Sequence, residues 1–366
     1  MRGIVLGLAV AATPAAAEPV AITARDGYVL HGQVDRPAGE TDGPKVVVLM
    51  VPGTGQFDRD VRFGRSGTEA DKLFKDLSAR ITARGVSTLR YDLRGVGYGG
   101  RPSDRAVLVA RTTDSMRDDV ADLYAWARSR DGLGARCAIL FGHSEGMVHI
   151  GRVADAGAPE PLAVVGMGAL LESPQSVMRW QLVGRNVDAV RAMDADRDGR
   201  TSNEEVRVGF ATSIGAAMLP VGAFIHPNGG WGASEIAAYE AAAATGYEAM
   251  RTAFLAKAPT DPYPEAASGW SSYQWWNSWF TDDRPVAARL ARWRVPVRIH
   301  YGDRDSQTDA KRQVAAGRAA LGERFTWTIH EGAGHGLGDH ITVGPMKPEI
   351  AHAIAADVAE AATACR

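Results

Sequence analysis

Short apolar runs alternate with stretches of helical periodicity over most of the chain. Residues 45–53 ("KVVVLMVPG") form a run of the kind expected for a buried strand. Leu73, Leu77 and Ile81 then recur every four positions, which places them on one face of a helix. Residues 21–37 have the pattern of an opening hairpin. Because alternating strands and helices are typical of α/β proteins, the pattern predicts a mostly parallel sheet flanked by helices.

The alternation is interrupted once. Further strands are predicted at 85–95, 135–146, 161–170, 295–305 and 325–336, and further helices around Met116, Val120, Leu123 and Ala127 and around Ile350, Ile354 and Val358. Between residues 171 and 292 the sequence is helical, Trp-rich and Pro/Gly-rich instead. The pattern therefore predicts a catalytic part, residues 18–170 and 293–366, with a helical cap, residues 171–292, inserted between strands six and seven.

The composition excludes several classes of partner. The chain has 366 residues, of which 45% are hydrophobic and 23% charged, and this suits one large domain with an insertion. The formal net charge is -2, so the sequence gives no electrostatic footprint for nucleic acid or for an anionic membrane. We expect neither partner.

The N-terminus has the features of a secretory signal. Arg2 precedes a short apolar run, and Ala15 and Ala17 have the spacing of a cleavage site, so residues 1–17 are predicted to be removed. A run this short does not span a bilayer, which takes roughly 20 residues. We therefore expect a periplasmic or secreted protein. In an oxidising compartment the two cysteines can pair, because Cys137 begins a strand at the edge of the sheet to which the closing helix should carry Cys365.

A candidate nucleophile lies in the motif G-x-S-x-G at residues 142–146 ("GHSEG"). A strand precedes the motif and a helix follows it, as in the strained turn that exposes a nucleophilic serine. The glycines on either side leave room for that turn. Ser144 is the predicted nucleophile.

The serine needs a base and an acid that orients the base. His335 lies in the Gly-rich turn "GAGHGL" after the last predicted strand, and either Asp303 or Asp305 follows the strand before it. The order Ser, Asp, His is the one found in α/β-hydrolases. Two backbone N–H groups should bind the oxyanion: that of Glu145, and that of Thr54 or Gly55.

With these motifs the sequence resembles the α/β-hydrolase superfamily over nearly the whole mature chain, and within it bacterial serine esterases and serine-aminopeptidase-like hydrolases. The likeness lies in "VPGTGQFDRD", "YDLRGVG", "GHSEG", "WFTDDRPVAARLARWRVPVRIHYGDRD" and "EGAGHGL". In that family the acid is usually the fourth residue of a G-x-x-D turn, which implies Asp305. The sequence departs from the family at Met147, where relatives have Gly, and in the loop described next.

Residues 194–205 ("DADRDGRTSNEE") match the calcium loop of an EF-hand. The expected ligands are the carboxylates of Asp194, Asp196 and Asp198, the carbonyl of Arg200, a water held by Ser202, and the carboxylate of Glu205. The chain has one such loop, and Thr201 occupies the place where a paired loop prefers an apolar residue. The sequence therefore predicts a structural Ca²⁺ site in the cap and no organic cofactor.

The predicted function is the hydrolysis of small carboxylic esters through an acyl-enzyme. A peptidase, aminopeptidase or thioesterase would use the same triad, and a calcium-binding protein without catalytic activity is a further alternative. Trp275, Trp276 and Trp279 fit an acyl pocket and the core of the cap equally well. Residues 58–60 are interpreted as a salt-bridged anchor of the oxyanion turn.

Overall fold

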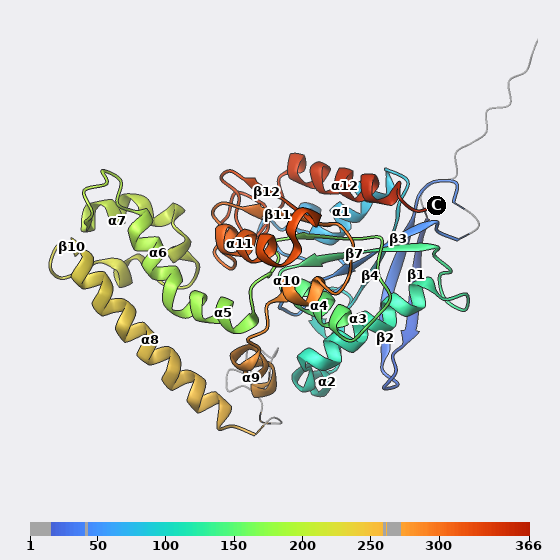
Figure 1. Ribbon diagram of the computed structural model, residues 1–366, viewed down its shortest axis with the longest axis horizontal. Helices are drawn as coiled ribbons and strands as arrows, with labels where there is room; N and C mark the ends of the chain where they lie inside the picture. Colours follow the sequence, from blue (N-terminus) through green and yellow to red (C-terminus); the bar gives the residue numbers. More distant parts are fainter. Residues whose placement is uncertain (1–15, 41–42, 259–260, 262–271) are drawn as a thin grey trace, which may run out of the picture.

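An eight-stranded sheet forms the centre of the computed structural model, which describes residues 16–366 apart from 41–42, 259–260 and 262–271 (Figure 1). Its strands are β1 (Ala16–Thr23), β2 (Val29–Arg36), β3 (Val46–Val51), β4 (Ser87–Tyr91), β7 (Cys137–His143), β8 (Ala163–Met167), β11 (Val297–Gly302) and β12 (Phe325–His330). They lie in the order β1-β2-β4-β3-β7-β8-β11-β12. The first three are antiparallel and all later neighbours are parallel, which confirms the predicted sheet.

Helices cover both faces of this sheet (Figure 1). They are α1 (Leu73–Thr82), α2 (Arg105–Ala110), α3 (Thr113–Arg128), α4 (Gly146–Asp155), α5 (Pro174–Arg179), α6 (Arg185–Ala192), α7 (Asn203–Gly209), α8 (Ala233–Leu255), α9 (Tyr273–Thr281), α10 (Val286–Leu290), α11 (Ala310–Leu321) and α12 (Pro348–Ala362). Shorter elements are the turns η1 (Glu69–Asp71), η2 (Trp180–Gly184), η3 (Phe210–Thr212), η4 (Ile214–Ala217), η5 (Val221–Phe224) and η6 (Gly322–Arg324), and the strands β5 (Val96–Gly97), β6 (Arg101–Pro102), β9 (Thr201–Ser202) and β10 (Gly230–Trp231).

The core has two layers because the central strands are apolar on both faces. In β3, Val47, Leu49 and Val51 pack with residues of α3 and α4. The alternate residues of the same strand, such as Val48 and Met50, pack with residues of α1 and α12 on the other face. Successive side chains of a strand point to opposite faces, so a continuous apolar run is what a sheet covered on both sides requires.

The segment between β8 and β11 is helical and contains α5 to α10. Figure 1 shows α6, α7 and α8 to one side of the sheet. A separate small core holds this region together: Ala189, Val190, Met193, Val206, Phe224 and Trp231. Not all of the insertion is separate, however, since α10 packs against α4: a Cβ on Gly151 would lie 2.9 Å from Val286.

The helix after the predicted calcium loop is shorter than the sequence pattern suggests. The pattern of residues 203–219 ("NEEVRVGFATSIGAAML") predicts one helix, but α7 ends at Gly209 and gives way to the 3-10 turns η3 and η4. Ser213 lies between these turns with an extended backbone, and its hydroxyl accepts the N–H of Gly215. Glycines in this stretch lower helix stability, and the serine caps a new turn.

The C-terminal tail lies at the edge of the sheet where β7 begins, opposite the turn at Ser144. A disulfide joins Cys137 to Cys365, as predicted. The predicted cleavage point after Ala17 falls within β1, and the rest of the predicted signal, residues 1–15, lies outside the described residues. Within the described part of the chain, no helix combines the length and the apolar composition needed to cross a membrane.

Candidate active site

Ser144 lies at the turn between β7 and α4. Its φ of 54° is in the left-handed region that non-glycine residues rarely adopt, as expected for a strained turn that exposes the hydroxyl. Gly146 is required next to it, because a Cβ there would lie 2.2 Å from the carbonyl oxygen of Val51. Within "GHSEG" Ser144 alone is partly exposed, and its four neighbours are buried. The turn thus presents one side chain and hides the rest.

The turn after β3 packs directly on the nucleophile turn. A Cβ on Gly53 would lie 2.8 Å from the Cβ of Ser144, so only glycine allows this approach. Thr54 and Gly55 follow and are partly exposed. Among the described residues, no acceptor is bonded to the backbone N–H of Thr54, Gly55 or Glu145. These N–H groups, predicted from the sequence as oxyanion donors, are therefore available beside Ser144.

His335 and Asp305 form a buried pair. The Nδ1 atom of His335 lies 2.8 Å from Oδ2 of Asp305, and the two residues are 2% and 3% exposed. The other hydrogen bonds of the carboxylate come from the N–H groups of Gln307 and Thr308, at 2.7 and 2.8 Å, and from the Thr308 hydroxyl at 2.7 Å. Each carboxylate oxygen thus has fixed partners. The structure brings His335 to Asp305 and leaves Asp303 exposed on the same turn.

The imidazole of His335 lies beside the nucleophile turn. The N–H of Ser144 donates to the carbonyl of Met167, and the next residue, Gly168, lies against the imidazole. A Cβ on Gly168 would come within 2.8 Å of Nδ1 of His335, and the φ of this glycine is 51°. No pattern in the sequence marks Gly168, because its role depends on a contact between segments far apart in the chain.

His143, the residue before Ser144, packs against the same imidazole. The ring centroids of His143 and His335 are 5.1 Å apart, and Phe63 and Phe74 surround His143. Burial lowers the pKa of His143 well below its usual range, and the neighbouring His335 lowers it further. His143 is therefore neutral and adds no positive charge beside the base.

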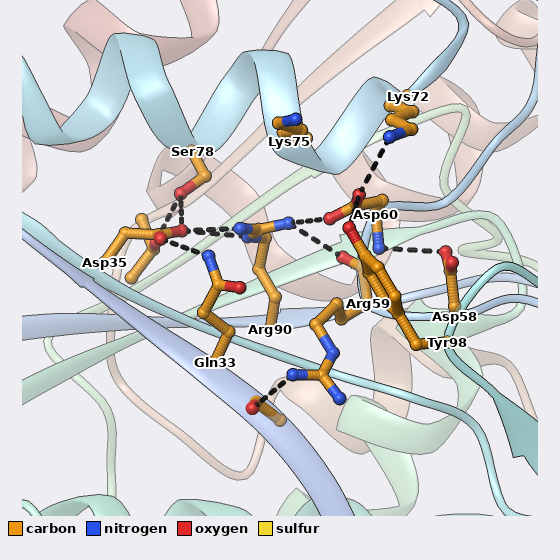
Figure 2. A network of polar contacts seen from close by, with 12 residues as sticks. Gln33, Asp35, Asp58, Arg59, Asp60, Lys72, Lys75, Ser78, Arg90 and Tyr98 are labelled. Carbon is orange, nitrogen blue, oxygen red and sulfur yellow. Dashed lines mark hydrogen bonds and ion pairs between the residues drawn. The ribbon is translucent and has the colours of Figure 1, made fainter. Parts of the chain in front are cut away.

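A buried ion-pair network anchors the chain that carries the oxyanion turn (Figure 2). Arg90 is 2% exposed and lies between Asp35, at 2.8 Å, and Asp60, to which it also donates a hydrogen bond. Asp60 accepts a further bond from the Tyr98 hydroxyl at 3.0 Å and pairs with Lys72 at 3.5 Å. One buried guanidinium thus ties β2, β4 and the loop after β3 together.

The neighbours of Asp60 complete this anchor. Arg59 pairs with Asp92 at 2.6 Å and donates to the carbonyl of Gly32, also at 2.6 Å. Asp58 accepts the N–H of Gly99 at 2.7 Å. The interpretation of residues 58–60 as a salt-bridged anchor is confirmed for Arg59 and Asp60, whereas Asp58 holds backbone groups.

The side chain of Glu145 has a role that the sequence did not indicate. It is fully buried, and its Oε1 atom accepts the indole N–H groups of Trp275, at 2.8 Å, and Trp279, at 3.1 Å. Its Oε2 atom accepts the Thr54 hydroxyl at 2.5 Å. Burial raises the pKa of Glu145, while these donors and the charge of Arg111 oppose the rise. Two of the three tryptophans of α9 therefore bond through this carboxylate to the turn between β7 and α4.

The loop at residues 194–205 brings three of its predicted ligands together. Carboxylate oxygens of Asp194, Asp196 and Asp198 lie within 4.8 Å of one another. Gly199 has a φ of 86°, as the sharp turn requires. Glu205 lies outside this group: it accepts the N–H of Ala195 at 2.8 Å and hydrogen bonds from Ser202.

Three further features of this loop bear on its fit to a cation. The Oδ1 atom of Asp194 is buried, and within the described chain it accepts no hydrogen bond. Thr201 at the eighth place pairs with Trp231 of β10, so this strand occupies the position that a second calcium loop would take in a pair. Hydrogen bonds from Ser202 lower the pKa of Glu205 to about 2, so this carboxylate is charged. The donor set fits a hard cation that prefers oxygen ligands.

Solved structures of other proteins superpose on this chain over most of its length. No family model matches the chain, and no curated protein matches it. A solved structure of DcsB in complex with its substrate analogue superposes with a TM-score of 0.53 at 16% identity, over 95% of this chain and 99% of that one. Est1E from Butyrivibrio proteoclasticus gives a TM-score of 0.48 at 12% identity, over 94% and 99%. The α/β hydrolase GrgF from Penicillium sp. sh18 gives 0.48 at 15% identity, over 87% and 91%. At 16% identity the superposition with DcsB speaks to the fold alone, and together with the strand order and the strand-to-helix turn at Ser144 it shows the α/β-hydrolase fold.

Proposed function

We propose that this protein is an exported serine hydrolase that cleaves carboxylic esters, and that Ser144, His335 and Asp305 act as its catalytic triad. The observation that carries the proposal is the buried hydrogen bond between His335 and Asp305, which lies beside a serine on a strained strand-to-helix turn. A serine needs a base, and the base needs an orienting carboxylate.

The first half of the reaction forms an acyl-enzyme. The Oγ atom of Ser144 attacks the ester carbonyl while Nε2 of His335 accepts its proton, and Asp305 holds the Nδ1–H of the imidazolium. The carbonyl oxygen becomes an oxyanion, which accepts hydrogen bonds from the N–H of Glu145 and from that of Thr54 or Gly55. The C–O bond to the alcohol then breaks, and His335 returns the proton to the leaving alkoxide.

Water completes the cycle. His335 accepts a proton from a water molecule, the resulting hydroxide attacks the acyl carbon, and the same N–H groups hold the second oxyanion. The bond to Oγ breaks, Ser144 recovers its proton from His335, and the carboxylic acid leaves. Neutral His143 beside the imidazole adds no charge that would oppose the imidazolium.

We further propose that the loop at 194–205 holds Ca²⁺ as a structural ion in the insertion. Asp194, Asp196 and Asp198 would supply carboxylates, Arg200 a carbonyl and Ser202 a water contact, and Glu205 would turn towards the ion from its present bonds. The free oxygen of Asp194 supports this proposal. Bound Ca²⁺ would offset part of the negative charge of the three carboxylates and fix the angle between α6 and α7. Titration calorimetry of the chelator-treated protein with Ca²⁺ tests it, and a heat indistinguishable from dilution would reject it.

A substrate panel distinguishes esterase from peptidase and thioesterase activity. Initial rates should be measured on p-nitrophenyl acetate, an aminoacyl p-nitroanilide and an acyl thioester, with the Ser144→Ala protein as the control for spontaneous hydrolysis. We expect the ester to have the highest kcat/KM. A higher value for the anilide or the thioester would replace the esterase proposal with the corresponding alternative. If the wild type hydrolyses none of the three substrates and a fluorophosphonate probe leaves its serine unlabelled, a binding protein without catalysis is the better account.

A further inference from the structure

Two tryptophans of α9 reach out of the insertion to the residue after the nucleophile. Trp275 and Trp279 are four positions apart, so they lie on the same face of the helix. Both are buried, at 7% and 5% exposure, and both indole N–H groups donate to the same oxygen of Glu145. An indole N–H can only donate, so each needs an acceptor once it is out of water. Glu145 supplies it for both.

The other oxygen of Glu145 binds the oxyanion turn. The Thr54 hydroxyl donates to Oε2, and the backbone N–H of Thr54 is one of the proposed oxyanion donors. The peptide N–H of Glu145 is another. One side chain therefore contacts α9 and the turn after β3 while its own backbone belongs to the nucleophile turn.

A buried arginine supports the same turn from its other end. Arg111 is 4% exposed, and its Nη2 atom donates to the carbonyl of Gly55 at 3.1 Å. Its positive charge also favours the ionised form of Glu145. A buried carboxylate without partners would be strongly destabilising, whereas here three donors and a nearby cation compensate for the lost hydration. The side chains of Glu145 and Arg111 therefore hold both residues from which the second oxyanion donor comes.

We propose that Glu145 is a positioning residue: its carboxylate makes the geometry of the oxyanion donors depend on the docking of α9, so the insertion acts on the acyl-transfer step as well as on access to the site. The proposal rests on the proposed serine hydrolase function. Donors of this kind are effective only when they already point to the place where charge develops, and a displacement of about 1 Å can lower the rate by about 10²-fold. Loss of the α9 contact should therefore lower kcat more than it raises KM.

The experiment compares Glu145→Gln with Glu145→Ala. Glutamine can accept both indole N–H groups on its carbonyl oxygen and donate its amide to the Thr54 hydroxyl, so we expect it to retain most of kcat. Alanine removes all three bonds and should lower kcat on the order of 10²-fold with little change in KM. A merely structural role would instead lower the melting temperature while kcat per folded molecule stays unchanged.

A second pair of variants covers the case in which Glu145→Ala does not fold. Trp275→Phe and Trp279→Phe each remove one N–H donor and keep an aromatic ring, and each should lower kcat. Trp180→Phe is the matched control, because Trp180 is a buried tryptophan of the insertion whose N–H donates to a different carboxylate, that of Asp188, at 2.9 Å. We expect it to leave kcat unchanged.

Labelling by a fluorophosphonate separates this inference from the proposed function. If the wild type neither reacts with the probe nor hydrolyses the ester, the serine hydrolase proposal fails and takes the inference with it. If the wild type is active while the Trp275→Phe and Trp279→Phe proteins, or a folded Glu145→Ala protein, retain its kcat, the function stands and the positioning role of Glu145 is rejected. Equal losses in Glu145→Gln and Glu145→Ala would also reject it, because the charge and not the bonding pattern would then matter.

Discussion

The site around His335 and the acidic loop of the insertion both contain aspartates, but the carboxylates are stabilised in different ways. At the sheet, Asp305 is 3% exposed and both of its oxygens accept hydrogen bonds from fixed groups. In the loop, Asp194, Asp196 and Asp198 lie close together, and within the described chain none of them forms an ion pair with a cationic side chain. The first arrangement is complete with protein atoms alone. The second places like charges side by side, which is unfavourable without a counter-ion.

The two glutamates of these regions show the same difference. Glu145 is buried and receives its hydrogen bonds from side chains of two distant segments, the turn after β3 and α9. Glu205 receives its own from the loop in which it lies, through Ala195 and Ser202. Tertiary packing therefore organises the first site, whereas local sequence organises the second. The predictions below test this contrast, beginning with the largest expected effect.

Loss of Ser144 or His335 should abolish turnover. Because the members of a triad act as a unit, Ser144→Ala and His335→Ala should each lower kcat by about 10⁶-fold while the melting temperature stays close to that of the wild type. Steady-state kinetics on p-nitrophenyl acetate and a thermal melt measure both. Substantial residual activity in Ser144→Ala would show that another group is the nucleophile.

The acid assignment can be tested within one turn. Asp305→Asn keeps the size of the side chain but disfavours the required tautomer of His335, so kcat should fall by about 10⁴-fold. Asp303→Asn is the matched control, since Asp303 is exposed on the same turn, and its kcat should change little. A reversed pattern would make Asp303 the acid and would contradict the buried geometry.

Calcium should act on stability more than on chemistry. If the folded insertion binds Ca²⁺ and the unfolded chain does not, Ca²⁺ at about 100 times its Kd adds about 2.7 kcal/mol to the free energy of unfolding. Chelator should thus lower the melting temperature of the wild type, and Asp196→Ala or Glu205→Ala should remove this dependence. Glu204→Gln is the control, because Glu204 is exposed and pairs with Arg207.

Two results would contradict the calcium prediction. A wild-type melting temperature that responds neither to chelator nor to added Ca²⁺ would remove the ion from the folded protein. A response retained in Asp196→Ala would place the ion elsewhere. A fall of kcat on chelation as large as that in Ser144→Ala would break the contrast drawn above, because the loop would then control the chemistry directly.

The smallest effect concerns acid stability of the sheet region. His149 is buried, both of its ring nitrogens lack hydrogen-bond partners in the described chain, and burial lowers its pKa to about 3. Its pKa in the unfolded chain is near 6.5, so the unfolded state binds more protons between pH 6.5 and 3. Stability is therefore complete above pH 6.5 and is lost as the pH falls through this window.

His149→Leu should reduce that loss. The melting temperatures of the variant and the wild type should be similar at pH 8, and the variant should lose less between pH 6.5 and pH 4. His352→Gln is the control, since His352 is exposed. Parallel curves for His149→Leu and the wild type would show that His149 does not titrate in this window.

Much of the fold could be predicted from local patterns. The continuous apolar run of β3 and the four-residue spacing in α1 identified their elements, because a strand buried on both faces and a helix buried on one face each leave a periodic signature. Ser144 could also be predicted from local sequence, since the glycines around it mark a tight turn between a strand and a helix. The length of α7 was predicted wrongly, because its apolar residues continue beyond Gly209 although the helix does not.

The sequence by itself determined the alternation of strands and helices, the turn at Ser144, the pairing of Cys137 with Cys365 and the close approach of the three loop aspartates, because each depends on neighbours in the chain or on the direction of one strand and one helix. The residues alone left Asp303 and Asp305 open and the family resemblance implied Asp305, which the tertiary structure brings to His335. Only the tertiary structure showed that Gly168 leaves room for the imidazole. It also decided that Glu145 receives two tryptophans of α9. The contacts of Glu145 with α9 join segments more than 100 residues apart in the chain. Packing between such distant segments leaves no periodic pattern in the sequence.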